Sequence, residues 1–186
     1  MDPMTAQPLS VLTDDERAFQ AAVADFAAGE VAPRVAAMER AAKLDPELIP
    51  KYFEMGLMGI QVPEEHGGAG GSVMMVTLAV EEISKVDASA AIMVDVQNTL
   101  VAYPMLTAAS DEQKARWFPT FCSGETITAI AMTEPGTGSD LQGIKTRAVL
   151  DGDEYVINGS KTFITNGINA DLVLVVCQTD PEAGAM

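Results

Sequence analysis

The chain has 186 residues, of which 48% are hydrophobic and 20% charged, a composition that suits one packed domain or two small ones and excludes a wholly disordered chain. Its 11 basic and 27 acidic residues give a net charge of −16, which disfavours binding to nucleic acid or to anionic membrane surfaces. Cys122 and Cys177 have neither CxxC nor histidine spacing, so the sequence indicates neither a disulfide framework nor a zinc site.

The N-terminus carries no basic region followed by an apolar one, and no apolar run approaches the length that a bilayer requires. We therefore expect no membrane span. A reducing, cytoplasmic location fits the composition best.

Residues 1–12 are expected to form a tail, and residues 13–124 a helical domain. Thr13 and Glu16 have the spacing of a capping box, and apolar residues recur at helical spacing after it. The pattern predicts a helix that ends near Pro33 and then a second, shorter helical piece.

The next stretch alternates helix and turn signals. Asp45-Pro46 predicts the start of a short helix that Gly56 ends. Residues 56–63 are apolar but interrupted by glycines, which indicates extended backbone leading to a turn at residues 64–71. His66 lies in this turn, so we expect it to be exposed and assign it no chemistry.

Three further helices complete the predicted helical domain. Ser72 can cap a helix that runs to about Val86, and residues 88–109 form a long apolar helix. A second capping box at residues 110–113 opens a helix that Ser123-Gly124 ends.

A polar patch interrupts the long apolar helix at Asp95, Gln97, Asn98 and Thr99. Buried polar groups need hydrogen-bond partners. Two interpretations stay open: Gln97 and Thr99 contact a substrate, or the patch makes hydrogen bonds that support helix packing.

Beyond Gly124 the periodicity changes from helical to strand-like, so residues 125–186 are predicted to be the first part of an antiparallel β domain that the chain does not complete. The fold class is therefore α+β. The predicted strands are a three-stranded meander at residues 146–150, 154–157 and 161–165, with turns at Asp151-Gly152 and Asn158-Gly159, and a buried strand at residues 172–177.

The stretch from Ala131 to Asp140 follows an apolar extended run and contains Pro135, two glycines and three hydroxyl residues. Such a loop can present backbone N–H groups and hydroxyls to an uncharged polar edge or to a phosphate, or it can be a plain surface turn. It lacks both the lysine of a P-loop and the spacing of a dinucleotide fingerprint. Glu134 within it is either a general base or an acceptor for backbone N–H groups, and we favour the second.

This loop and residues 159–167 together resemble the paired flavin-contacting signatures of the acyl-CoA dehydrogenase family. The similarity covers nearly everything after Thr13. Further segments are similar to the short-chain and branched-chain members in particular: residues 56–59, 63–68, 81–89 and 97–100.

The resemblance implies that FAD lies against the β domain. Thr133 would hydrogen-bond the flavin ring, Thr165 would lie near its reactive nitrogen, and Ser139 would lie near the flavin phosphate and the CoA arm of the substrate. The cofactor-contacting residues implied in this way are Ile130, Met132, Thr133, Gly138, Ser139, Phe163, Ile164 and Thr165.

Three residues depart from the family pattern. Phe163 stands where many members have tryptophan, Thr137 replaces a small residue and His66 replaces a common tyrosine. Phe163 keeps an aromatic wall but lacks an indole N–H.

The activity implied is α,β-desaturation of a short or branched acyl-CoA, in fatty-acid or branched-chain amino-acid catabolism. The resemblance also implies an electron-transfer flavoprotein as acceptor and a homotetramer. The family's base is a glutamate of the C-terminal helical domain, so we assign no catalytic residue to this chain. A non-catalytic partner subunit and an acyl-CoA oxidase are the alternatives.

Overall fold

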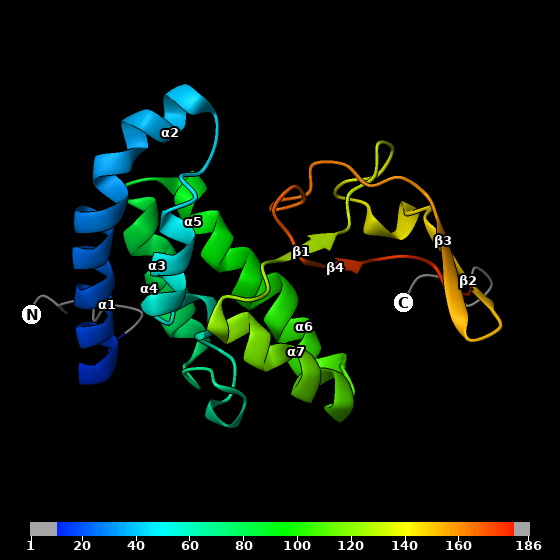
Figure 1. Ribbon diagram of the computed structural model, residues 1–186, viewed down its shortest axis with the longest axis horizontal. Helices are drawn as coiled ribbons and strands as arrows, with labels where there is room; N and C mark the ends of the chain where they lie inside the picture. Colours follow the sequence, from blue (N-terminus) through cyan, green and yellow to red (C-terminus); the bar gives the residue numbers. More distant parts are fainter. Residues whose placement is uncertain (1–10, 181–186) are drawn as a thin grey trace, which may run out of the picture.

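The computed structural model describes residues 11–180 and has a helical part followed by a smaller β part (Figure 1). The α+β fold class is confirmed. The elements are α1 (Asp14–Phe26), α2 (Val35–Ala41), α3 (Leu48–Glu54), α4 (Val73–Ser84), α5 (Ala88–Asp95), α6 (Tyr103–Ala108), α7 (Asp111–Ser123), β1 (Thr128–Ala131), β2 (Arg147–Asp151), β3 (Glu154–Asn158) and β4 (Leu172–Val175).

The predicted helix starts are confirmed where a side chain caps the first turn. The Thr13 hydroxyl accepts from the Glu16 N–H and the Glu16 carboxylate accepts from the Thr13 N–H, which completes the capping box of α1. The box at the start of α7 closes in the same way, and the Ser72 hydroxyl caps α4. Each such cap contributes about 1 kcal/mol to helix stability.

The helix that starts at Thr13 continues past α1 through a π turn, Ala27–Val31, and a 3₁₀ turn, Ala32–Arg34, into α2. Pro33 lies in that 3₁₀ turn. The predicted interruption near Pro33 and the second short helix after it are confirmed.

The predicted long helix over residues 88–109 is present, with a π-helical segment, Val96–Ala102, between α5 and α6. The Asn98 amide donates to the Val94 carbonyl and the Thr99 hydroxyl donates to the Asp95 carbonyl, both at 2.9 Å. Side chains that compete for these carbonyls disturb the regular hydrogen-bond ladder, which favours a widened turn.

Residues 56–63 are not extended, contrary to the prediction. Gly56 has a left-handed conformation (φ 70°) and turns the chain into a 3₁₀ segment, Leu57–Gly59. The Leu57 carbonyl accepts from the Asn98 amide at 2.8 Å. Tertiary packing therefore decides this conformation, because the apolar residues of the segment all enter the core: Leu57, Met58, Ile60 and Val62.

Two smaller predictions also need correction. The short helix expected from Asp45-Pro46 begins only at Leu48, because the Asp45 carboxylate accepts from the Glu47 N–H and forms a turn. The His66 side chain is only 22% exposed, since its ring packs 5.4 Å from that of Phe118.

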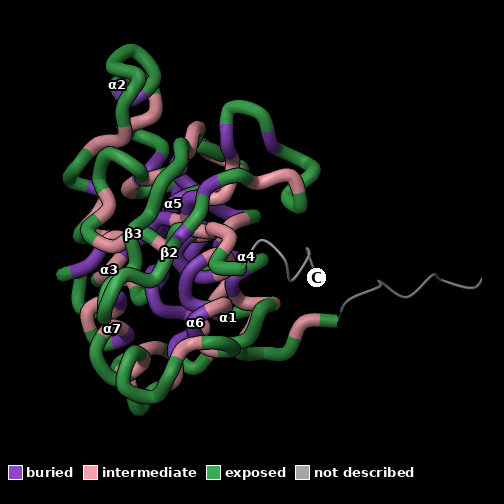
Figure 2. The backbone as a smooth tube through the Cα atoms, turned by 90° about the vertical axis from the view of Figure 1, so that its right-hand side faces the viewer, coloured by how far each residue is buried: buried purple, intermediate pink, exposed green. Residues whose placement is uncertain are grey.

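Buried residues concentrate in the helical part, as Figure 2 shows. One core cluster joins α1, α3, α4 and α5, and includes Val23, Tyr52 and Ile83. A second cluster around Phe118 and Phe121 extends to Ile130, Leu172 and Leu174. The second cluster therefore packs β1 and β4 against the helices. Within residues 11–180, no helix is both long enough and apolar enough to cross a membrane.

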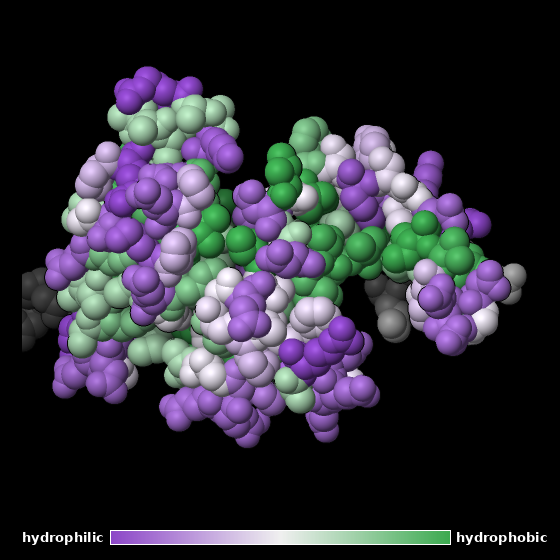
Figure 3. All heavy atoms as spheres, viewed as in Figure 1, coloured by the Kyte–Doolittle hydropathy of each residue, from purple (hydrophilic) through white to green (hydrophobic). Residues whose placement is uncertain are grey.

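The β part contains two separate strand pairs. β2 and β3 form the predicted antiparallel hairpin, in which Gly152 takes the left-handed turn conformation. β1 and β4 pair in parallel, with Thr128 opposite Leu172, whereas an antiparallel domain was expected. Ala148 of the hairpin is buried, whereas its large apolar residues stay exposed: Val149, Leu150, Tyr155, Val156 and Ile157. Figure 3 shows hydrophobic surface on the β part of the molecule.

The predicted third strand of the meander, residues 161–165, is not a strand. Asn158-Gly159 does not turn the chain back on β3, and the backbone approaches the β1 side instead, where the Thr162 N–H donates to the Thr133 carbonyl at 2.9 Å. Gly159 is required for close approach, because a Cβ at this position would lie 2.2 Å from the Thr146 Oγ1.

Candidate functional site

A cavity of about 130 Å³ lies where the helical part meets the β part. It collects side chains from three segments that are far apart in the sequence. The lining residues are Val96, Leu100, Ile130, Met132, Thr133, Phe163, Ile164 and Thr165.

Six of the eight cofactor-contacting residues expected from the sequence line this cavity together. They come from the end of β1 and from the segment that was predicted as a third strand. Gly138 and Ser139 do not line it and lie in an exposed turn beyond Glu134. The hydroxyls of Thr133, Ser139 and Thr165 have no hydrogen-bond partner within residues 11–180.

Gln97 positions β1 against the helices. Its side chain is completely buried, and its oxygen accepts from the Thr128 backbone N–H at 3.1 Å and from the Thr128 hydroxyl at 2.5 Å. Its amide nitrogen donates to the carbonyls of Phe121 and Thr126. Because protein groups occupy this amide fully, we leave Gln97 out of the substrate contacts proposed below.

Thr99 also has protein partners. Its hydroxyl lies 2.9 Å from the Asp95 carbonyl and 2.9 Å from an Asp95 carboxylate oxygen. The two helix residues that do line the cavity, Val96 and Leu100, were missed in the sequence. Their i, i+4 spacing places them on one helix face and was the available signal.

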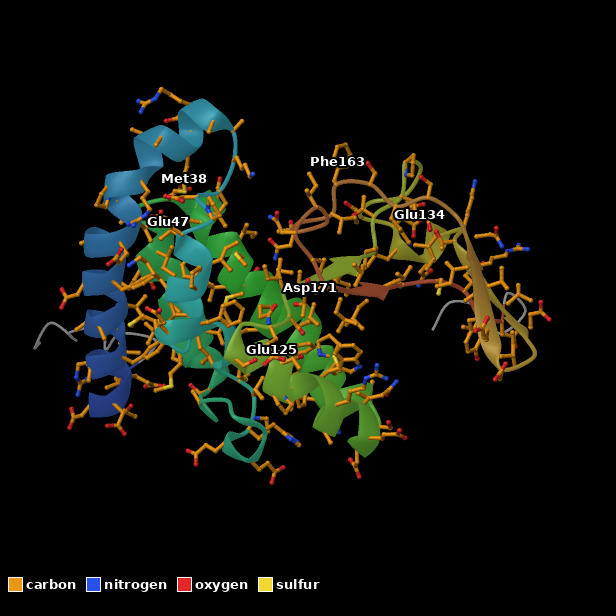
Figure 4. The ribbon with its side chains drawn as sticks, in the orientation of Figure 1. Met38, Glu47, Glu125, Glu134, Phe163 and Asp171 are labelled. Atoms are coloured by element: carbon orange, nitrogen blue, oxygen red, sulfur yellow. The ribbon has the colours of Figure 1, made fainter. Side chains whose placement is uncertain are left out.

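Phe163 combines an exposed ring with an unusual backbone. The residue is 91% exposed and has φ 56°, in the left-handed region that non-glycine residues rarely adopt. In Figure 4 it lies between Glu134 and the helices. Asn166 is also left-handed (φ 62°), and its amide donates to the Thr128 carbonyl at 3.2 Å. This strained arch therefore presents an aromatic ring at the cavity rim instead of burying it.

Glu134 is an acceptor for neighbouring donors, as the sequence favoured. Its carboxylate accepts from the backbone N–H groups of Lys145 and Thr146 at 2.7 and 2.9 Å, and from the Lys161 ammonium at 2.9 Å. The Thr146 side chain beside it, these N–H groups and the Lys161 ammonium lower the pKa of Glu134 to about 2, despite its burial. A carboxylate this acidic and this fully engaged is a poor proton acceptor at neutral pH.

Thr137, the departure from the small residue of the family pattern, is buried and shapes the same loop. Its backbone exchanges two hydrogen bonds with Glu134, and its hydroxyl donates to the Gly143 carbonyl at 3.0 Å. The larger side chain therefore stabilises the turn that carries Gly138 and Ser139.

The residues present fit one wall of a site for a planar ring system with polar edges. The cavity has apolar and aromatic lining and two hydroxyls that lack a hydrogen-bond partner in the described part of the chain, and it is smaller than a pocket that encloses a whole ligand. Among residues 11–180, no group of histidine, cysteine and acidic side chains is arranged to hold a metal ion.

Comparison with known sequences places the chain in a family. The model of the acyl-CoA dehydrogenase N-terminal domain matches residues 13–125, and the model of the acyl-CoA dehydrogenase middle domain matches residues 129–186. The mitochondrial short/branched chain specific acyl-CoA dehydrogenase of Rattus norvegicus is 39% identical over 95% of this chain and 41% of its own length.

Solved structures also match this chain. A chain from work on the electron transferring flavoprotein of Acidaminococcus fermentans matches with a TM-score of 0.89 and 39% identity, over 96% of this chain and 47% of that one. A glutaryl-CoA dehydrogenase from Mycobacterium smegmatis in complex with FADH2 matches with a TM-score of 0.86 and 34% identity, over 91% and 44%. The chain thus spans less than half the length of these relatives, and it belongs to the acyl-CoA dehydrogenase family, a family of oxidoreductase flavoproteins.

Proposed function

We propose that the cavity between β1 and the Phe163–Thr165 arch receives the ring system of FAD, in a protein that desaturates a short or branched acyl-CoA at its α,β carbons. The observation that supports this most is the meeting of the two sequence segments, residues 130–133 and 163–165, in one cavity. The relative solved with FADH2 supports the choice of cofactor.

Each lining residue has a role in this proposal. Phe163, Ile130 and Met132 provide the apolar surface against which the ring packs. Thr133 and Thr165 offer hydroxyls that have no partner within the described chain. Bound FAD supplies a hydride acceptor, which no amino-acid side chain provides.

Gly138 and Ser139 have a different role, because they lie outside the cavity on an exposed turn. A free N–H and a hydroxyl on such a turn suit a phosphate or the arm of CoA. Ser139 is therefore our proposed contact for both the flavin phosphate and the substrate. Thr99 remains a weaker candidate for the substrate, since it is only half-buried.

The proton acceptor of the reaction is proposed to lie in the C-terminal helical domain of the family. No carboxylate lines the cavity within residues 11–180, and the Glu134 carboxylate accepts hydrogen bonds from three donors behind the cavity. The role of this chain is then to bind and orient the cofactor and to provide one side of the acyl site.

The proposed electron acceptor is an electron-transfer flavoprotein, supported by the similarity to a chain from work on such a protein. A homotetramer, a cytoplasmic location and a catabolic role complete the proposal. The net charge of −16 agrees with a protein that does not use nucleic acid or anionic membranes as partners.

Anaerobic titration with a short acyl-CoA tests this function. A purified, FAD-loaded protein that joins this chain to the C-terminal domain of the family should be yellow and should lose its visible absorbance when butyryl-CoA or a branched acyl-CoA is added. FAD that binds but does not bleach with any acyl-CoA would contradict the enzymatic function and favour a non-catalytic partner subunit. Peroxide formation in air, without reduction of an added dye, would identify an oxidase.

A further inference from the structure

Two segments make up the proposed flavin site, and an ion pair behind the cavity joins them. Lys161 is 10% exposed and Glu134 is 7% exposed, so both charges are largely withdrawn from water. The Lys161 ammonium lies 2.9 Å from a Glu134 carboxylate oxygen. A charge pair buried to this degree is costly unless both groups are fully hydrogen-bonded.

Both charged groups have further hydrogen-bond partners. The bonds that Lys161 and Thr162 make join one half of the site to the other. The Lys161 ammonium also donates to the Met132 carbonyl at 2.8 Å, and the next residue, Thr162, donates its N–H to the Thr133 carbonyl at 2.9 Å. Three successive residues of the first half are therefore bonded to two successive residues of the second.

The ion pair is next to cavity-lining residues in the sequence but does not itself line the cavity. Glu134 follows Thr133 directly, and Lys161 precedes Phe163 by two residues. Thr133 and Phe163 line the cavity, whereas Glu134 and Lys161 do not. The far end of the arch is held separately, by the Asn166 amide on the Thr128 carbonyl. Between these two attachments, Phe163 and Thr165 have no hydrogen bond to the first half within residues 11–180.

We propose that Glu134 and Lys161 are positioning residues for the flavin: their ion pair sets the separation between Thr133 and the Phe163–Thr165 arch, and thereby the affinity for FAD. This inference rests on the proposed function of the cavity. Neither residue needs to touch the cofactor. A displacement of about 1 Å in a contacting group is enough to change binding or reaction strongly.

The test compares lysine variants of the protein in FAD titrations, followed by the quenching of flavin fluorescence. Lys161→Met removes the ammonium and keeps the aliphatic stem, and we expect it to raise the Kd for FAD by about tenfold or more and to shift the visible spectrum of bound FAD. Lys161→Arg keeps a cation and should restore binding to within about threefold of the parent.

Lys145→Met is the matched control. The Lys145 side chain is exposed and forms no ion pair within residues 11–180, while its backbone N–H still donates to Glu134. It changes the net charge by the same amount as Lys161→Met, so it corrects for the general attraction of an anionic cofactor. Its Kd should stay within about twofold of the parent.

The outcomes separate this inference from the proposed function. A parent protein that does not bind FAD would overturn both. A parent that binds FAD, with Lys161→Met binding equally well and giving the same spectrum, would overturn the positioning role alone. If Lys161→Met does not unfold cooperatively, Lys161→Gln replaces it, because glutamine keeps a donor for the Met132 carbonyl but carries no charge. A parent-like Kd for FAD and a parent-like spectrum in Lys161→Gln would then overturn the positioning role.

Discussion

The amide oxygen of Gln97 accepts hydrogen bonds from both the backbone N–H and the hydroxyl of Thr128, at 3.1 and 2.5 Å. Gln97 belongs to the π-helical segment of the helical part, and Thr128 is the first residue of β1. This relationship fixes β1, which carries Ile130 and leads into Met132 and Thr133, on the helical segment that carries Val96 and Leu100. The cavity exists because these two elements are joined at this point.

Replacement of Gln97 by leucine should therefore destabilise the fold. The variant leaves buried donors of Thr128 and buried carbonyls of Phe121 and Thr126 without this partner, and the expected loss in unfolding free energy is about 3 kcal/mol. Urea denaturation measures it. Gln142→Leu is the control, since Gln142 is exposed and has no hydrogen-bond partner within residues 11–180. Equal stability of the two variants would contradict the role given to Gln97.

The pH dependence of stability should carry a contribution from Glu134. The Thr146 side chain beside it, the backbone N–H groups of Lys145 and Thr146, and the Lys161 ammonium lower its folded-state pKa from 4.5 to about 2. Because the folded value is lowered, this carboxylate stabilises the fold above the unfolded pKa, and the stabilisation is lost as the pH falls from about 4.5 toward about 2.

Glu134→Gln tests this contribution by comparison with the parent protein in urea titrations at a series of pH values. The variant should be less stable at neutral pH, and the difference should shrink as the pH is lowered through that window. Glu39→Gln, at an exposed site without an ion pair within the described chain, is the control. A difference between parent and Glu134→Gln that stays constant with pH would argue against the network.

Phe163→Ala should separate stability from cofactor binding. The ring is 91% exposed, so its removal should change the unfolding free energy by no more than about 0.5 kcal/mol. The same change removes the aromatic wall proposed for the flavin and should weaken FAD binding severalfold. Thermal unfolding of the FAD-free protein and a fluorescence titration provide the two measurements. A marked loss of stability without any loss of affinity would show that the ring serves the fold.

Gly159→Ala should destabilise the protein through a steric clash. The new Cβ would lie 2.2 Å from the Thr146 Oγ1 and 2.7 Å from its Cα, so the backbone must shift, at a cost of about 1–3 kcal/mol. Gly29→Ala is the control, because nothing lies within 4 Å of a Cβ there and the residue is helical. The control should be neutral or slightly stabilising; a tolerated Gly159→Ala would contradict the close approach.

Local signals in the sequence predicted the helical part well. The capping boxes at Thr13 and Ser110 and the cap at Ser72 act within three residues, so their chemistry is readable without tertiary structure. The resemblance in turn identified six cavity residues. Their meeting in space could not be read from spacing alone.

The errors in the prediction arise where contacts between residues far apart in the sequence determine the backbone conformation. Residues 161–165 alternate like a strand, but Lys161 and Thr162 bond to residues 132–134, almost thirty positions earlier, and Phe163 takes a left-handed conformation. The apolar run after Gly56 is compact for a similar reason. The Asn98 amide donates to the Leu57 carbonyl, and the apolar side chains of the run are buried in the core. Neither contact leaves a local pattern.

Hydrogen–deuterium exchange with and without FAD tests the two-part flavin site most directly, because it locates the cofactor on the chain. We predict that FAD slows exchange in peptides covering residues 130–139 and in peptides covering residues 161–167, with no comparable change in the exposed β2–β3 hairpin. Protection of only one of the two segments, or protection confined to the helical part, would contradict the site.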